Sequence, residues 1–380
     1  MAWKIPLSDI AMGSEEGEAV RDVLQSRWLS MGPVTGEFET AFARYLRVKH
    51  AFAVSNGTAA LHIAHAVLGI GAGDEVITPS LTFVATANSV LYCGARPVFA
   101  DIGGKNDLNI SWEEIEEKVS EKTRAITVVH YGGYACDMRP IMEIARDHDL
   151  RVVEDTAHAI GATCGGRMCG TVGDIGCFSF FANKNLATGE GGMIVTDDDL
   201  LAEKIRTMRS HGMTTLTWDR HRGHSSSYDV VDLGYNYRMC EVAAALGIVQ
   251  LRHLEQNNER RRRIAARYRK ALDGIEHITC PFSGRENGES SCHIFPVILS
   301  ADLVRGNLQA ALKEQGIQTS IHYPPVHLFT YYQRLFGDTR GSLPKTEFIG
   351  EHEMTLPLYP GMTDDDVDYI CTAIEEAVPG

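Results

Sequence analysis

The sequence has little positive charge and no long apolar run. Its 36 Lys and Arg residues stand against 50 Asp and Glu residues, which gives a net charge of −14 at pH 7. This balance argues against a nucleic acid or an anionic membrane surface as the main partner. No segment stays apolar over the roughly 20 residues that a transmembrane helix needs. We therefore expect a protein that binds neither nucleic acid nor membrane.

Metal-binding patterns are missing as well. The nine cysteines include no Cys-x-x-Cys pair, and no histidine pair follows Cys164 and Cys169 at the spacing of a zinc site. We therefore expect no metal. Many lone cysteines are typical of a reducing compartment, and the first residues lack the apolar core of a signal peptide. Both features favour the cytoplasm.

What the sequence does contain is an alternation of short apolar strands and amphipathic helices. Strands are expected near residues 51–54, 75–78, 97–101, 125–130, 151–155 and 193–196. Helices are expected between them, including one from Thr58 and one over 82–91. This order predicts an α/β protein with a mostly parallel sheet that helices cover on both faces.

The second half of the chain predicts a smaller unit. A helical pattern continues through Val242, Leu246 and Val249 to about Leu272, which is long for a globular protein, and we interpret it as a bridge. Strands near 295–299 and 319–323 follow it, with helices near 304–315 and 364–377. We therefore expect a large domain over residues 1–250, with an N-terminal arm, and a smaller α/β domain over 251–380.

Lys184 stands where an apolar strand, Cys177 to Phe181, runs into a loop rich in glycine. A lysine at such a boundary lies partly in apolar surroundings, which disfavour the ammonium form. Its pKa should therefore fall and its amine become nucleophilic, as a Schiff-base lysine requires. The alternative is an ordinary surface lysine on a loop.

Other candidate residues stand at or just past the ends of predicted strands. Gly57, Phe83 and Asp155 share this position with Lys184, and ligands of parallel sheets bind outside the carboxyl ends of the strands. The turn before Thr58 leads into a helix, whose first N–H groups are suited to an anion such as phosphate. The same turn is also compatible with an ordinary capped helix.

These residue types match the needs of pyridoxal 5′-phosphate chemistry. That chemistry uses a lysine, a carboxylate at the pyridine nitrogen, an anion cradle, a group on the ring face and a proton shuttle. Asp155 is the candidate carboxylate. Glu154 is its rival, but successive strand residues point to opposite faces, so only one of the two can face the ring. Phe83 would stack on the ring, unless it is plain core.

Two further residues complete this set. His158, three residues after Asp155, is placed to contact the cofactor ring or its 3-oxygen, although a hydrogen-bonded core histidine is an equal alternative. Ser179 would bind the phosphate through its hydroxyl, unless it is a strand serine bonded to the backbone. Lys184 would also act as the proton shuttle, in the manner of a general acid–base group.

Seven segments, in chain order, carry a resemblance to a known family. They are Ser-Asn-Gly-Thr-Ala-Ala-Leu at 55–61, Pro-Ser-Leu-Thr-Phe-Val-Ala-Thr at 79–86, Glu-Asp-Thr-Ala-His at 154–158, Phe-Ser-Phe through Lys-Asn-Leu-Ala-Thr-Gly-Glu-Gly-Gly at 178–192, Gly-Tyr-Asn-Tyr-Arg at 234–238, Ile-His-Tyr-Pro-Pro-Val-His-Leu at 321–328 and Leu-Pro-Leu-Tyr-Pro at 356–360. Over nearly its whole length the sequence resembles the DegT/DnrJ/EryC1/StrS family. These are pyridoxal-phosphate-dependent sugar aminotransferases of the aspartate aminotransferase (type I) fold.

The resemblance implies roles for individual residues. Lys184 matches the Schiff-base lysine and Asp155 the partner of the pyridine nitrogen. The implied phosphate and ring contacts are Gly57, Thr58, Ala59, Ser179, Phe83 and His158. Asn236 matches a residue that reaches the phosphate from the neighbouring subunit, which implies a homodimer with its active site at the subunit interface. Tyr323 and His327 lie in a segment that borders the sugar site in relatives.

One departure from the family concerns Phe181-Ala182-Asn183, which stand where many relatives have His-Pro-Thr. This difference leaves the contacts at the edge of the ring open. Some family members are dehydratases in which histidine replaces the lysine, and the presence of Lys184 disfavours that branch.

We therefore expect an aminotransferase that moves an amino group from L-glutamate to a nucleotide-linked keto-sugar, in amino-sugar biosynthesis. Arg220, Arg222 and His224, in a long polar loop, would meet the nucleotide diphosphate. Two alternatives remain open. One is a keto-cyclitol aminotransferase of the scyllo-inosose type, which would share every catalytic residue named. The other is a sensor that binds pyridoxal phosphate without turnover.

Overall fold

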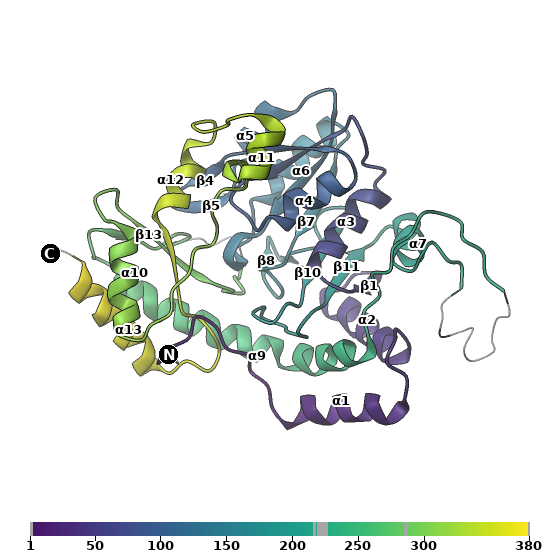
Figure 1. The fold of residues 1–380 in the computed structure, drawn as a ribbon, viewed down its shortest axis with the longest axis horizontal. Helices are drawn as coiled ribbons and strands as arrows, with labels where there is room; N and C mark the ends of the chain where they lie inside the picture. Colours follow the sequence, from purple (N-terminus) through teal and green to yellow (C-terminus); the bar gives the residue numbers. More distant parts are fainter. Residues whose placement is uncertain (1–2, 216–217, 219–226, 285–287, 379–380) are drawn as a thin grey trace.

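The structure, a computed structural model, describes residues 3–215, 218, 227–284 and 288–378. At its centre lies a seven-stranded sheet with the strand order β1-β11-β10-β7-β6-β2-β3 (Figure 1). Its strands are β1 (His50–Val54), β2 (Glu75–Pro79), β3 (Arg96–Ala100), β6 (Thr123–Val129), β7 (Arg151–Asp155), β10 (Ile175–Ser179) and β11 (Gly192–Thr196).

The sheet is parallel except for one strand. β11 runs antiparallel to both of its neighbours, β1 and β10, while all other neighbouring pairs are parallel. The prediction of a mostly parallel sheet is therefore confirmed. The carboxyl ends of six strands meet at one edge, where Gly192 of β11 pairs with both Val54 and Ser179.

Helices cover both faces of this sheet. On one face, Phe52 and Val54 pack in a core with α3 (Gly57–Val67) and α7 (Asp199–Met208). On the other face, Ala51 and Ala53 pack in a core with residues of two further helices. These are α2 (Pro33–Leu46) and α9 (Glu241–Leu272). Because both faces of the sheet are buried, the strand sequences are continuous apolar runs and do not alternate between apolar and polar residues.

The remaining elements of this part lie around the sheet. The helices are α1 (Ser14–Ser26), α4 (Ala85–Tyr92), α5 (Trp112–Lys118) and α6 (Met138–Asp147). Of these, α1 packs along α9. The short elements are β4 (Ile102–Gly104), β5 (Asp107–Ile110), β8 (Thr163–Cys164), β9 (Arg167–Met168) and the 3₁₀ turn η1 (Tyr131–Gly133).

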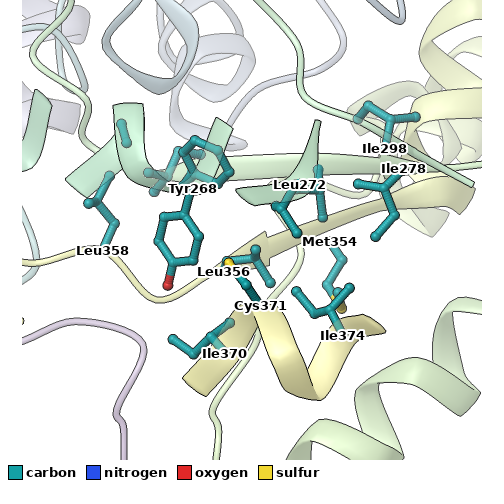
Figure 2. Packing of buried hydrophobic residues seen from close by; sticks show 14 of the residues in the cluster. Tyr268, Leu272, Ile278, Ile298, Met354, Leu356, Leu358, Ile370, Cys371 and Ile374 are labelled. Carbon is teal, nitrogen blue, oxygen red and sulfur yellow. The ribbon is translucent and has the colours of Figure 1, made fainter. Parts of the chain in front are cut away.

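A second core forms around a three-stranded antiparallel sheet, with the order β12-β13-β14. Its elements are β12 (Ile278–Thr279), β13 (Phe295–Leu299), β14 (Glu353–Leu356), α10 (Arg305–Glu314) and α13 (Asp364–Ala377). Figure 2 shows Tyr268 and Leu272, from the end of α9, among Leu356, Ile370 and Ile374 of this core. The long helix therefore contributes side chains to both cores.

The boundary expected after residue 250 falls inside α9. Three elements that follow it in sequence are η2 (Val326–Leu328), α11 (Thr330–Phe336) and α12 (Pro344–His352). They return to the large sheet, where the N–H groups of Lys345 and Thr346 donate to the carboxylate of Asp101. Conversely, Ile5 belongs to the N-terminal part of the chain but is buried in the second core.

Two local predictions were wrong. The helix expected from Thr82 begins at Ala85, and the hydroxyl of Thr82, which precedes the helix, lies 2.8 Å from the hydroxyl of Thr86 in the first helical turn. The strand expected at 319–323 is reduced to one bridge, between Ser320 and Thr355. There the N–H of His322 donates to the Glu353 carboxylate instead of to a neighbouring strand. Over the described ranges, no helix is both long and apolar enough to cross a membrane.

Candidate active site

A cavity of about 520 Å³ lies at the carboxyl edge of the large sheet. Its walls come from the ends of β1, β2, β7 and β10 and from the segment around Tyr323. From the residues singled out in the sequence, the cavity lining brings together Gly57, Thr58, Phe83, Asp155, His158, Ser179, Lys184 and Tyr323. Residues that are far apart in the chain thus share one site.

Lys184 lies in the loop that connects β10 to β11. Its N–H donates to the carbonyl oxygen of Phe181 at 2.9 Å, and the loop turns back at Gly189, where φ is +84°. The side-chain Nζ lies 3.2 Å from Nε2 of His293. Burial lowers the pKa of Lys184 to about 8, and the negative charge of Asp155 opposes this shift. The pKa therefore moves in the direction that the sequence predicts.

Asp155 is the last residue of β7, and its carboxylate faces the cavity. Oδ2 accepts a hydrogen bond from the Thr86 hydroxyl at 2.8 Å, and Oδ1 accepts one from the Ala157 N–H at 3.1 Å. Burial nevertheless raises the pKa of this carboxyl. The carboxylate is thus poorly solvated, and a positively charged N–H group in the cavity would stabilise it.

Glu154, the rival of Asp155, points to the other face of the sheet. Its carboxylate accepts hydrogen bonds from the N–H groups of Gly170, Val172 and Gly173 and lies 2.8 Å from Nε2 of His130. Although burial opposes ionisation, these hydrogen bonds lower the pKa of Glu154. Glu154 therefore ties loops together on the far side, as the alternation of strand side chains predicts.

The N-terminus of α3 opens into the same cavity. The helix begins at Gly57, and Oδ1 of Asn56 caps it by accepting the N–H of Ala59 at 2.8 Å. A Cβ atom at Gly57 would lie only 2.8 Å from Cβ of Ser179, so glycine permits the helix end to approach β10. The first N–H groups of a helix lack intrahelical acceptors and attract anions.

The prediction for Ala59 needs correction. Ala59 does not line the cavity, and its N–H is already engaged by the cap of Asn56. The N–H groups available to an anion at this helix end are therefore those of Gly57 and Thr58, beside the hydroxyl of Ser179.

Aromatic and histidine side chains also line the cavity. Phe83 is 57% exposed, and its ring centroid lies 6.0 Å from that of Tyr323. Nδ1 of His158 accepts the N–H of Gly132 at 3.3 Å, and its Nε2 lies 2.9 Å from the Tyr323 hydroxyl. Burial holds the pKa of His158 well below its usual range, so this ring is neutral.

Some predicted site residues are not brought to this cavity. His327 is buried elsewhere, with Nδ1 2.6 Å from the Ser80 hydroxyl and Nε2 3.2 Å from the Glu347 carboxylate. Asn236 forms a bridge with Ser210 and does not line the cavity of its own chain. Arg220, Arg222 and His224 lie outside the described residues.

Other residues of the site escaped the sequence reasoning. His293 contacts Lys184, but it lies before the amino end of β13. Ligand-binding residues were expected at the carboxyl ends of strands, so this position was not predicted. His322 lines the cavity, and burial lowers its pKa to about 4. Thr86 supports Asp155 from the first turn of α4. Each of these roles depends on tertiary contacts between distant segments.

Comparison with known proteins explains this arrangement. The sequence pattern of the DegT/DnrJ/EryC1/StrS aminotransferase family matches residues 11–375. The chain belongs to this family. Among its relatives is the spore coat polysaccharide biosynthesis protein SpsC of Bacillus subtilis (strain 168), which is 43% identical over 99% of this chain and 97% of SpsC. The enzyme is accordingly a sugar aminotransferase that depends on pyridoxal phosphate.

Solved structures support the same assignment. PseC of Helicobacter pylori, an aminotransferase involved in the biosynthesis of pseudoaminic acid, superposes with a TM-score of 0.92 at 30% identity, over 98% of each chain. Spr1654 of Streptococcus pneumoniae, solved in a PMP form and a PLP form, reaches TM-scores of 0.92 and 0.91 at 30% identity, over 99% of this chain and 100% of Spr1654. The fold is therefore that of the type I pyridoxal-phosphate-dependent transferases.

The residues of the cavity fit this cofactor. Its aldehyde needs an amine of lowered pKa, and its pyridine nitrogen needs a carboxylate in a poorly solvated position. Its phosphate needs an anion site, and the first N–H groups of α3, which Gly57 allows to approach Ser179, are suited to one. Lys184, Asp155 and this helix end all border a single cavity of suitable size.

Proposed function

We propose that this enzyme transfers the amino group of L-glutamate to a keto-sugar carried on a nucleotide, in amino-sugar biosynthesis. The observation that carries the proposal is the amine of Lys184, its pKa lowered to about 8, on the wall of a cavity that also contains Asp155. The names of SpsC and PseC, one concerned with a polysaccharide and the other with pseudoaminic acid, support a sugar as amino acceptor.

The proposal assigns roles in cofactor binding to several residues of the cavity. Bound pyridoxal phosphate supplies an electron-accepting ring and an aldehyde that links to amines. Gly57, Thr58 and Ser179 would hold its phosphate, and Phe83 and His158 would contact its ring. Asp155 would accept a hydrogen bond from the ring nitrogen and keep that nitrogen protonated.

Lys184 would carry the proton transfers. A pKa of about 8 leaves part of its amine unprotonated near neutral pH, so Nζ is able to take a proton from the donor carbon. The resulting ammonium returns the proton within the same cavity.

The proposed substrate contacts rest on the cavity lining of this chain and on the resemblance to the family. Tyr323 lines the cavity and offers a ring and a hydroxyl to the sugar. His327 would act only through its hydrogen bonds to Ser80 and Glu347. Arg220, Arg222 and His224 would bind the diphosphate, as expected from the sequence. We also propose a cytoplasmic homodimer in which Asn236 serves the cavity of the neighbouring subunit.

A panel of ketones tests this proposal. The purified enzyme, with L-glutamate as donor, would be offered nucleotide-linked keto-sugars and a keto-inositol, and 2-oxoglutarate release would be measured. The proposal predicts turnover with at least one nucleotide keto-sugar at a kcat/KM at least about 10-fold above that with the keto-inositol. Turnover with the keto-inositol alone would identify a cyclitol aminotransferase instead.

A further inference from the structure

The amine of Lys184 lies against a histidine that no motif of the sequence pointed to. Nζ of Lys184 is 3.2 Å from Nε2 of His293, which is 4% exposed. Such a contact has two possible directions, because a neutral imidazole carries its proton on only one nitrogen. The neighbours of His293 decide which direction applies.

Two buried asparagines fix the direction. Nδ2 of Asn258 donates to the carbonyl oxygen of Ile160 at 3.0 Å, so its Oδ1 is the atom that accepts from Asn185 at 2.8 Å. Nδ2 of Asn185 donates to this oxygen and also to the carbonyl of Ser291 at 2.8 Å. The remaining amide atom of Asn185, its Oδ1, therefore faces His293. An amide oxygen can only accept a hydrogen bond.

The proton of His293 is therefore on Nδ1, which lies 3.0 Å from Oδ1 of Asn185. Nε2 is left with its lone pair, and that lone pair faces Lys184. Burial, together with the positive charge of Lys184, holds the pKa of His293 well below its usual range, so the ring stays neutral. The lysine is thus the donor in this contact and the histidine the acceptor.

The backbone of His293 is also held in place. Nη1 of Arg261, from α9, donates to the carbonyl oxygens of His293 at 3.2 Å and of Leu358 at 2.8 Å. Arg261 is 3% exposed. Both ends of the histidine, its backbone carbonyl and its Nδ1–H, therefore have buried partners, and its Nε2 has a defined position in the cavity wall.

We propose that His293 is a positioning residue that holds the amine of Lys184 by accepting its hydrogen bond at Nε2 whenever that amine is free of the cofactor. The proposal rests on the assignment of Lys184 as the working amine. By accepting from the ammonium form, Nε2 stabilises the lysine that has just taken a proton. By orienting the neutral form, it directs the nitrogen lone pair into the cavity.

Other titratable groups also act on this pair. Those around Lys184 and His293 are Asp155 from β7, His158 from the turn after it, Arg261 from α9, and His322 and Tyr323 from the segment before η2. The test must therefore change the acceptor at Nε2 and leave these groups in place.

Two substitutions of His293 distinguish the roles of its two ring nitrogens. In His293→Asn the side-chain amide reaches the place of Nδ1, so the contact with Asn185 is kept and the acceptor beside Lys184 is lost. In His293→Gln the amide reaches the place of Nε2, so an acceptor beside Lys184 is kept and the donor to Asn185 is lost. The two variants thus serve as controls for each other.

The measurement is the pKa of Lys184 in the full-length protein without added cofactor. Pulsed acetylation with acetic anhydride between pH 6 and pH 10, followed by peptide mass spectrometry, reports the reactive fraction of this amine. We expect the pKa in His293→Asn to fall by about one unit or more below that of the unchanged protein, since the ammonium loses an acceptor. We expect His293→Gln to retain a value within about 0.3 units.

The opposite order would overturn the proposal. If His293 only supports Asn185 structurally, His293→Gln is the damaging change and His293→Asn leaves the pKa of Lys184 unchanged. Equal pKa values in all three proteins would overturn it as well. Because this readout uses neither a sugar nor glutamate, failure of the proposed substrates leaves the result for His293 intact, and failure for His293 leaves the substrate assay intact.

Discussion

The carboxylates of Glu154 and Asp155 lie on opposite faces of the large sheet, although the two residues are adjacent in β7. Asp155 faces the cavity with Lys184, while Glu154 binds three backbone N–H groups of the loop from Gly170 to Gly173 on the far face. The first carboxylate is available to a ligand and the second is saturated by the protein. The two acids are similarly buried but have different roles, so substitutions of each should have different effects.

Asp155→Asn should slow the half-reaction with glutamate by about 10²-fold or more, because a neutral amide no longer stabilises a positive charge on the ring nitrogen. Glu154→Gln should instead lower the free energy of unfolding by about 3 kcal/mol, since a buried charged acceptor is lost. Stopped-flow absorbance of the bound cofactor and urea unfolding measure the two effects. A Glu154→Gln enzyme that is stable but inactive would reverse the assignment.

Gly57→Ala should weaken the binding of pyridoxal phosphate by about 10-fold or more, because the new Cβ would lie 2.8 Å from Cβ of Ser179 and push the end of α3 away. Gly36→Ala is the matched control, since nothing lies within 4 Å of a Cβ at that helical position. It should leave cofactor affinity unchanged. Fluorescence titration of the cofactor-free proteins gives both affinities, and equal affinities would contradict the proposed phosphate site.

Glu353 should make stability depend on pH. Burial raises its pKa from 4.5 to about 8, even though the His322 N–H and the Thr355 hydroxyl donate to it. Between these two pH values the folded protein binds more protons than the unfolded chain, so the free energy of unfolding decreases as pH rises. Glu353→Gln cannot ionise and should escape about 2 kcal/mol of this loss between pH 6 and pH 8.

Urea unfolding at the two pH values tests this effect. Exposed Glu351 lies two residues earlier, and Glu351→Gln serves as the control that should follow the unchanged protein. Parallel losses of stability in the protein with Glu353 and in Glu353→Gln would show that Glu353 ionises normally in the folded state.

Asn236 should act on the cavity of the partner subunit. Lys184→Ala and Asn236→Ala would be mixed to give hybrid dimers, isolated with two affinity tags. In such a hybrid the cavity that keeps Lys184 receives Asn236 from the other subunit, so it should bind pyridoxal phosphate with unchanged affinity. The Asn236→Ala homodimer should bind more weakly. A hybrid as weak as that homodimer would place Asn236 in its own chain's site.

The sequence alone predicts the outline of the site well. Apolar strands that end in Asp155, Gly57 and the Lys184 loop meet at one edge because parallel strands share the direction of their carboxyl ends. Strand alternation also separates Glu154 from Asp155 correctly.

Other features depend on contacts between distant segments, which periodicity does not reveal. His293 stands 109 residues after Lys184 and meets it only through the tertiary fold, and the amide chain through Asn185 and Asn258 sets its tautomer. The family resemblance placed His327 in a segment that borders the sugar site, but hydrogen bonds to Ser80 and Glu347 hold its ring outside the cavity lining. Ala59, which was expected to bind phosphate, differs from these two, because the Asn56 side chain that accepts its N–H is a local N-cap.

The central claim is that the amine of Lys184 holds the cofactor. Borohydride reduction of the enzyme loaded with pyridoxal phosphate, followed by peptide mass spectrometry, tests it most directly. The account predicts one phosphopyridoxyl group per chain, located on Lys184, and none in a Lys184→Ala variant. A label on another lysine, or no label on a protein that has bound the cofactor, would contradict it.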